Sequence, residues 1–328
     1  MIITQTPFRV SFFGGGTDFK PFFEKHAGSV LSTTINKYVY THVRRLPKFF
    51  DYHTQIKYAK TESVRKTEEL EHPLVRNCML HTDSHNLSIL YDADLPARSG
   101  LGSSSSFAVG LLQALYAMDG KYVGKKQLAE DAIYVERVLC DESGGWQDQI
   151  AAAYGGLNRI DFNADGFSVS PIILSKKRKC ELESHMLMFF TGISRFSSQI
   201  EKEKIDTLGS KTSGLLEMRG LADEAVDILQ SNRDLAEFGK LLDHSWGLKR
   251  SLTSKITNDY IDDLYRKGVE RGALGGKLLG AGGGGFMMFF APPERHKAIR
   301  DELGNLIYIP VSLESEGSKI IHYIAESQ

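Results

Sequence analysis

The feature that most constrains the fold is a run of glycines and serines that leads directly into an apolar helical pattern. Residues 95–106 read LPARSGLGSSSS, and residues 107–120 continue as FAVGLLQALYAMDG. A flexible linker would carry glycine and serine on both sides, whereas the apolar residues that follow here have the spacing of a buried helix face. The pattern predicts a turn that opens a helix, where unpaired backbone N–H groups and the helix dipole favour an anion.

The residues of this turn indicate that the anion is a phosphate. Gly100 and Gly102 would let the backbone approach a phosphate chain closely, and successive N–H groups would surround it. Serine hydroxyls could also bind Mg²⁺ beside the phosphates. One serine suffices to cap a helix, so four serines after G-L-G make capping alone the weaker interpretation. The turn lacks the lysine of a Walker A loop, and no G-x-G-x-x-G motif follows the first predicted strand.

A second glycine cluster lies far along the chain. Residues 275–290 read GGKLLGAGGGGFMMFF. Because apolar residues flank the cluster, we interpret it as backbone that another group approaches closely and not as a flexible linker.

Four charged residues are candidates for a functional role. Arg9 is the lone charge in the apolar stretch PFRVSFF, and Asp18 follows a triple glycine, so Arg9 needs an anionic partner that a structural ion pair could also supply. Asp148, in SGGWQDQIAAAYGG, fits a helix cap and a catalytic base equally well. Glu136 lies at the edge of a helical apolar stripe, where periodicity alone favours an ordinary, partly exposed acid.

The chain divides into a mixed first half and a helix-rich second half, with a boundary zone of short strands near 155–175. We expect strands over 1–13, 30–43 (one strand or a pair), 54–59, 87–91, 185–190, 285–290, 306–312 and 318–325. We expect helices over 104–118, 125–141, 196–206, 212–230, 233–250, 258–270 and 293–303. The lysine-rich run 176–179 is interpreted as a solvated turn between strands. The closing strand–helix–strand order suggests a ferredoxin-like α+β sandwich.

Composition excludes several classes of protein. Lys and Arg number 40 and Asp and Glu 41, a net charge of −1, which argues against a nucleic-acid or membrane-surface binder. Three cysteines without C-x-x-C pairing fit a reducing compartment. The N-terminus does not resemble a signal peptide, and no apolar run is long enough to span a bilayer. We therefore expect a cytoplasmic protein that binds neither nucleic acid nor membrane; a homodimer is left open.

Three stretches, taken in order, resemble the three motifs of the GHMP small-molecule kinase superfamily. They are P-F-R-V-S-F-F-G-G-G-T-D, P-A-R-S-G-L-G-S-S-S-S and K-L-L-G-A-G-G-G-G-F. The resemblance covers almost the whole chain and implies a two-domain α+β fold. A ribosomal-protein-S5-like domain would occupy residues 1–170 and a ferredoxin-like domain residues 171–328. ATP and Mg²⁺ would bind in the cleft between them.

The same resemblance assigns roles to individual residues. Asp148 matches the aspartate usually assigned as base for the acceptor hydroxyl, and Arg9 matches the basic residue that stabilises the acceptor oxygen. Ser104 and Glu136 match the Mg²⁺ ligands. The residues expected to bind ATP and its phosphates are Pro96, Ser99, Gly100, Leu101, Gly102, Ser103, Ser104 and Ser105. Those expected to bind the acceptor are Gly15, Gly16, Thr17, Asp18, Arg195 and Gly283.

The acceptor follows from a finer resemblance. Galactokinases have an acid and a histidine where this chain has Gly15 and Gly16, so they are disfavoured. G-G-G-T-D, with GSVLSTTINKYVY and FFTGISRFSSQI, resembles the D-glycero-D-manno-heptose 7-phosphate kinases. This implies phosphorylation of the anomeric hydroxyl to a 1,7-bisphosphate, a precursor of nucleotide-activated heptose for bacterial surface polysaccharides. Arg195 would bind the second phosphate, although a surface helix start explains it equally well.

Two rival functions remain open. An L-fucokinase-like enzyme would act on an unphosphorylated sugar, and Arg195 would then be dispensable. A catalytically silent sugar and ATP sensor would act through protein partners, but the presence of Arg9, Glu136 and Asp148 disfavours it.

Overall fold

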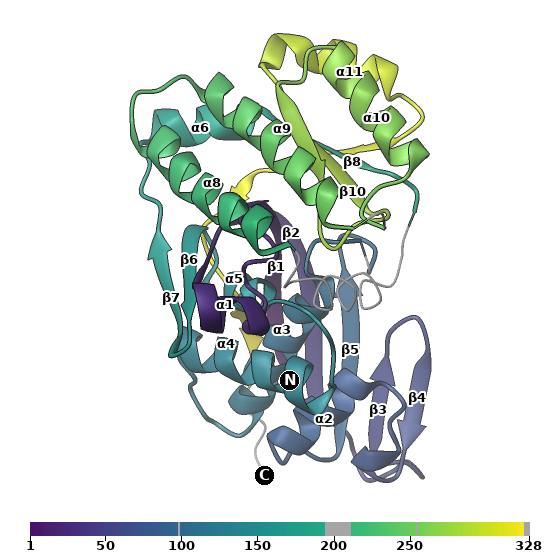
Figure 1. Cartoon of the computed structure of the whole chain (residues 1–328). Coiled ribbons are helices and arrows are strands. Elements are labelled where there is room, and N and C mark those ends of the chain that lie inside the picture. Colours follow the sequence, from purple (N-terminus) through teal and green to yellow (C-terminus); the bar gives the residue numbers. More distant parts are fainter. Residues whose placement is uncertain (98, 194–210, 254, 325–328) are drawn as a thin grey trace.

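The computed structural model describes residues 1–97, 99–193, 211–253 and 255–324. Figure 1 shows two α/β bodies, one formed mainly by the first half of the chain and one by the second. Part of the core is continuous between them, because residues of both halves belong to one buried cluster.

The first body is built on a sheet that has nine strands within the described residues, with a main strand order β13-β1-β2-β5-β3-β4. Strand β6 pairs with β2 and with β7, and the short strand β12 also pairs with β2. The strands are β1 (Ile2–Phe13), β2 (Gly28–Arg45), β3 (Thr54–Lys57), β4 (Thr61–Val64), β5 (Leu87–Ala93), β6 (Leu157–Asn163), β7 (Gly166–Pro171), β12 (Leu313–Glu314) and β13 (Lys319–Tyr323).

Helices cover the central strands β1 and β2 on both faces. Helix α3 contacts both strands, and helix α8 of the second body contacts them as well. Because both faces of β1 are covered, every residue from Pro7 to Phe13 is buried. A strand with one face in solvent would instead alternate buried and exposed residues. The helices of this body are α1 (Lys20–His26), α2 (Pro73–His81), α3 (Ser103–Met118), α4 (Lys125–Tyr134) and α5 (Gln147–Tyr154), with a 3₁₀ turn at Thr67–Glu69.

The second body has an antiparallel sheet of order β11-β8-β10-β9. Its strands are β8 (Met186–Phe190), β9 (Gly275–Leu278), β10 (Phe286–Phe290) and β11 (Ile307–Ile309). Alternate side chains of β10 enter different clusters: Met288 joins the cluster shared with the first body, and Phe289 joins a second cluster. The helices are α6 (Lys176–Ser184), α8 (Thr212–Gln230), α9 (Leu235–Leu252), α10 (Asp259–Glu270) and α11 (His296–Glu302), with a 3₁₀ turn at Pro293–Arg295.

One prediction of local structure is wrong, and another is only partly correct. The run 176–179 begins helix α6, because the Ser175 side chain caps the helix by accepting a hydrogen bond from the Arg178 N–H. The helix expected over 125–141 ends at Tyr134 and continues as a π-helical turn, Val135–Leu139. The helix expected over 196–206 lies outside the described residues.

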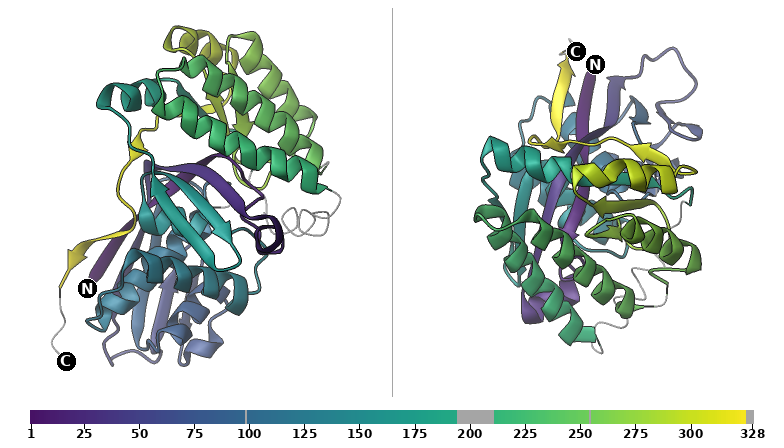
Figure 2. Two further views of the ribbon diagram at one scale, coloured as in Figure 1. Left: turned by 60° about the vertical axis from the view of Figure 1, so that its left-hand side comes forward. Right: turned by 90° about the horizontal axis from the view of Figure 1, so that it is seen from above.

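The last strands return to the first body. Strand β13 pairs antiparallel with β1, as Figure 2 shows for the yellow strand beside the purple one, and β12 pairs with β2. A single boundary at residue 170 therefore does not hold for residues 313–323. In the part of the chain that the structure describes, no helix is long and apolar enough to cross a membrane.

Candidate active site

The serine-rich turn opens helix α3 with a glycine as its N-cap. Gly100 and Gly102 have φ values of +83° and +77°, a backbone region that glycine enters without strain. Gly102 is the cap residue and has no side chain, so Ser103 to Ser106 form the first turn and no serine caps the helix. Ser104 is exposed, whereas Ser105 is buried. The N–H groups of this turn have the orientation that favours an anion.

The two glycine clusters lie in direct contact. A Cβ on Gly100 would collide with the carbonyl oxygen of Leu279, and a Cβ on Gly280 would collide with the Cα of Gly100. A Cβ on Gly285 would collide with the carbonyl oxygen of Ser99. The loop between β9 and β10 therefore packs directly against the backbone of the serine-rich turn. This close approach of two backbones explains why both stretches are rich in glycine.

Arg9 links this turn to Asp148. Its Nε and Nη2 donate to the two carboxylate oxygens of Asp148 at 2.8 and 2.9 Å, and its Nη1 donates to the carbonyl oxygen of Gly100 at 2.6 Å. The Arg9 side chain is 6% exposed and that of Asp148 is 23% exposed. A bidentate pair of this kind fixes both side chains, and Asp148 keeps access to the cavity beside it.

Asp18 is buried next to the start of helix α5, close to Asp148. Its carboxylate accepts hydrogen bonds from the Gly16 N–H at 2.9 Å and from the Gln147 side-chain amide at 2.9 Å. Burial raises the pKa of Asp18, and the negative charge of Asp148 raises it further, although these hydrogen bonds oppose the shift. Gly145 must be glycine, since a Cβ there would occupy the position of the Asp18 carboxylate.

A polar cavity joins these groups at the contact between the two bodies. Its charged and polar lining residues are Arg9, Ser11, Asp18, Arg137, Gln147, Asp148, Lys249 and Lys277. Gly15 and Gly16 line it too, and Phe19, Met218 and Leu252 add apolar surface. The Ser11 Oγ and the Gln147 Oε1 are buried and have no hydrogen-bond partner among the described residues. A hydroxylated, anionic small molecule would satisfy both atoms and the excess of cations.

Sequence reasoning missed three cationic residues of this cavity. The Lys249 ammonium donates to the carbonyl oxygens of Leu278 at 3.0 Å and Gly280 at 2.6 Å, and that of Lys277 donates to Phe12 at 2.7 Å. Lys277 lies inside the second glycine cluster, which was a usable signal. Lys249 and Arg137 lie in ordinary helical patterns, and their positions become evident from the tertiary structure.

Several predicted residues lie elsewhere or have other contacts. Thr17 is fully buried, and its hydroxyl bonds to the backbone of Gly14 at 2.8 Å and Ser29 at 3.0 Å. It therefore stabilises the loop, and the predicted hydrogen bond to a sugar is not supported. The Gly283 N–H donates to the carbonyl oxygen of Ile256 at 2.9 Å, away from the cavity lining. Pro96 is exposed, and Arg195 lies outside the described residues.

Glu136 is almost fully buried on the π-helical turn, contrary to the partly exposed acid that periodicity favoured. Its carboxylate accepts a hydrogen bond from the side-chain amide of Gln149 at 2.5 Å, one residue beyond Asp148. In the described ranges, no group of three His, Cys, Asp or Glu residues forms a metal cluster. Ser104 and Glu136 carry oxygen atoms of the kind that Mg²⁺ prefers, and their role as its ligands stays a prediction.

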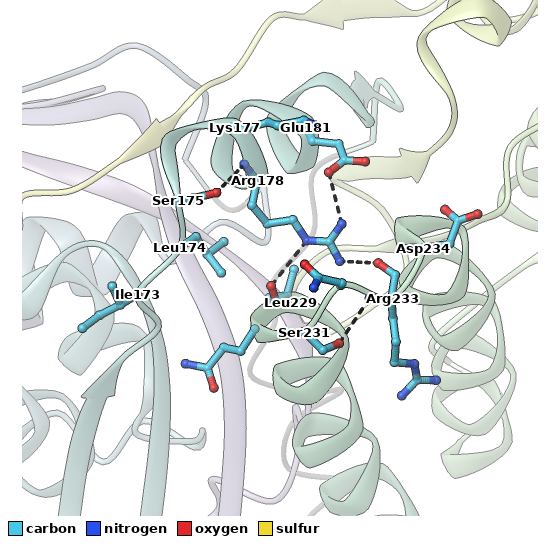
Figure 3. A pocket seen from close by; sticks show the side chains of 12 residues that line it. Ile173, Leu174, Ser175, Lys177, Arg178, Glu181, Leu229, Ser231, Arg233 and Asp234 are labelled. Carbon is cyan, nitrogen blue, oxygen red and sulfur yellow. Dashed lines mark hydrogen bonds and ion pairs between the residues drawn. The ribbon is translucent and has the colours of Figure 1, made fainter.

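A second cavity lies apart from this chemistry, between α6 and the turn that follows α8 (Figure 3). Arg178 fills one wall and donates to the carbonyl oxygens of Ile228 and Arg233, each at 2.7 Å. It thereby satisfies the C-terminal end of α8, which is a structural role.

Known proteins resemble the chain throughout. The GHMP kinase N-terminal domain matches residues 69–156, and the GHMP kinase C-terminal domain matches residues 224–308. A D-glycero-α-D-manno-heptose 7-phosphate kinase of Campylobacter jejuni is 31% identical, over 92% of this chain and 94% of its own. A bifunctional fucokinase/GDP-fucose pyrophosphorylase of Arabidopsis thaliana is 27% identical over 91% of this chain but only 31% of its own length.

Solved structures share the fold. A D-glycero-D-manno-heptose 1-phosphate kinase from Bacteroides thetaiotaomicron superposes with a TM-score of 0.81, at 24% identity, over 99% of this chain and 100% of its own. A putative sugar kinase from Campylobacter jejuni gives 0.71 at 26% identity, over 97% of each chain. The family models, the heptose phosphate kinase and the contact of two glycine clusters beside an Arg–Asp pair lead to one conclusion. The chain belongs to the GHMP kinases and is a phosphotransferase.

Proposed function

We propose that this protein transfers the terminal phosphoryl group of ATP to the anomeric hydroxyl of D-glycero-D-manno-heptose 7-phosphate. The observation that carries the proposal is the position of Arg9, which holds Asp148 and the Gly100 carbonyl at once. A phosphoryl donor on the serine-rich turn and an acceptor hydroxyl at Asp148 would then meet at one place. Transfer of this kind depends mainly on such positioning and on charge stabilisation.

The residues of the site divide the reaction between them. The N–H groups that open α3 would hold the phosphates of ATP, with Ser104 and Glu136 as the residues for Mg²⁺, which would neutralise charge on the transferred group. The acceptor oxygen forms its bond to the γ-phosphorus while the bond to the bridging oxygen of ADP breaks. The hydroxyl proton passes to Asp148 or to solvent. Arg9 would hold and orient Asp148, and Asp18, Gly15 and Gly16 would face the sugar.

The charge of the cavity supports a phosphorylated sugar. Among the described residues that line it, four side chains are cationic and two are carboxylates, one of which has a raised pKa. A sugar phosphate would balance this excess, whereas a neutral sugar such as fucose would not. The Campylobacter jejuni relative, a D-glycero-α-D-manno-heptose 7-phosphate kinase, points to the same acceptor.

The test is an ADP-release assay with Mg-ATP across five acceptors. They are D-glycero-D-manno-heptose 7-phosphate, mannose 6-phosphate, L-fucose, galactose and mevalonate. We expect turnover with the heptose phosphate, and a fall in kcat of about 10²- to 10⁴-fold in Asp148→Asn. Asp301→Asn, an exposed residue of α11, is the matched control.

Two outcomes would contradict the proposal. Turnover confined to L-fucose would support a sugar kinase but refute the heptose phosphate as its acceptor. Tight ATP binding without turnover of any acceptor would favour the sensor.

A further inference from the structure

Arg137 is a cavity residue whose position depends on the π-helical turn. The turn Val135–Leu139 directs Glu136 into the core toward Gln149, and Arg137 toward the cavity. π-Helical turns insert one residue into a helix and often occur at functional sites. Glu136 and Arg137 are neighbours in this turn, yet one carboxylate is buried in the core and the other side chain lines the cavity.

The guanidinium of Arg137 is anchored by backbone oxygens. Its Nε and Nη2 donate to the carbonyl oxygen of Gly145 at 3.2 and 3.0 Å, and its Nη1 donates to that of Glu142 at 3.4 Å. Among the described residues it forms no ion pair. Burial raises the pKa of the neighbouring Glu142, a shift that the positive charge of Arg137 opposes. One hydrogen on each terminal nitrogen remains beyond these three bonds, in the fork geometry that matches two oxygens of a phosphate.

A series of contacts connects Arg137 to the Asp148 end of the cavity. Asp148 borders the serine-rich turn at Gly102, and Gln147 holds the Asp18 carboxylate. Gly145, which anchors Arg137, lies against the same carboxylate. A sugar with one end at Asp148 and its ring hydroxyls at Asp18 would extend toward Arg137.

Two of the other cations lie toward the serine-rich turn. Lys249 donates to the carbonyl of Gly280, a residue in contact with Gly100 of the serine-rich turn. Arg9 is engaged with Asp148 and Gly100. Arg137 is anchored at Gly145 instead, beside the Asp18 carboxylate, so it is placed to meet the far end of the acceptor.

We propose that Arg137 binds the phosphate group that the acceptor already carries, and that it determines the preference for phosphorylated over unphosphorylated sugars. This inference rests on the proposed function. It assigns the second phosphate to a residue of the first body, whereas the sequence analysis assigned it to Arg195.

The experiment measures the ratio of the Kd of unphosphorylated D-glycero-D-manno-heptose to that of its 7-phosphate by calorimetry. We expect this ratio to fall about 10- to 100-fold in Arg137→Gln, the range for a lost charged hydrogen-bond pair. Arg137→Lys keeps the charge but loses the fork, so its ratio should be intermediate. Arg76→Gln is the control, because Arg76 also donates to a backbone carbonyl, that of Leu70 at 2.9 Å, but lies on α2 away from the cavity.

The outcomes separate the two proposals. If the wild-type protein phosphorylates the heptose phosphate and Arg137→Gln keeps the wild-type ratio, the role of Arg137 is refuted while the function stands. If both Kd values rise equally in Arg137→Gln, Arg137 supports the fold of the cavity and does not read the phosphate. If the wild-type protein neither phosphorylates nor prefers the heptose phosphate, both proposals fail.

Discussion

At the scale of single residues, three charged groups of the site could be predicted and three could not. Arg9, Asp18 and Asp148 each break an apolar or glycine-rich pattern, so their sequence context marks them. The sequence context does not mark Arg137 or Lys249, which lie in ordinary helical patterns. Lys277 lies among glycines that are the more conspicuous feature. Their partners are backbone carbonyls, which leave no trace in the sequence.

The raised pKa of Asp18 predicts a pH dependence of stability. A folded-state pKa above the ordinary 3.8 means that the folded protein binds this proton more tightly than the unfolded chain. The free energy of unfolding should therefore fall as pH rises from about 4 through the folded pKa, by up to about 1.4 kcal/mol per pH unit. Urea unfolding between pH 4 and 8 should show this fall in the wild type and not in Asp18→Asn. The exposed Glu68→Gln should keep the wild-type slope; parallel profiles for wild type and Asp18→Asn would contradict the prediction.

At the scale of elements, pattern and period predicted most of the helices and strands but not the interruptions. The apolar period placed α3 within one residue of its observed start, and α8 at its observed bounds. The π-helical turn was not predicted, because one inserted residue barely changes the apolar stripe of the helix. Helix α6 escaped because its residues are mostly charged, so no apolar face indicated it.

The contact of the two glycine clusters gives the prediction at this scale. Gly100→Ala and Gly120→Ala both place a side chain at a positive φ, +83° and +69°, so both carry a similar backbone strain. An added Cβ collides with Leu279 at position 100 and meets no atom within 4 Å at position 120. We expect Gly100→Ala to lower the free energy of unfolding, measured with urea, by about 1–3 kcal/mol more than Gly120→Ala does. Gly100→Ala should also weaken ATP binding, whereas Gly120→Ala should leave it unchanged. Equal losses in both variants would mean that strain and not the contact determines the effect.

At the scale of the whole molecule, the motif order predicted the family, whereas the path of the chain could not be predicted. Strand β13 was expected to end the second domain, since it follows a helix and a strand of that domain. Its pairing with β1 depends on tertiary contacts such as the hydrogen bond between the hydroxyls of Thr6 and Ser318 at 2.7 Å. A short strand with an ordinary pattern does not specify which sheet it joins.

This return predicts that removal of the last strands destabilises the first body. A chain that ends at residue 312 loses β12, β13 and the contact of Gly317 with the backbone of Ala153. At about 1 kcal/mol for each lost hydrogen bond, the cost is several kcal/mol, a large part of the stability of a typical domain. Thermal unfolding should show a much lower Tm than for a chain that ends at residue 324. Equal Tm values would contradict the prediction.

The pairing of β1 with β13 also has a consequence for how the protein is made. Thr6 and Ser318 are 312 residues apart, so the ribosome completes β1 long before its partner exists. At 5–20 residues per second, the interval is about 15 to 60 s. During this time one edge of β1 has unpaired backbone groups, which are a template for association between nascent chains. Newly made copies should therefore depend on chaperones, or on slow expression at low temperature, more than their final fold would suggest.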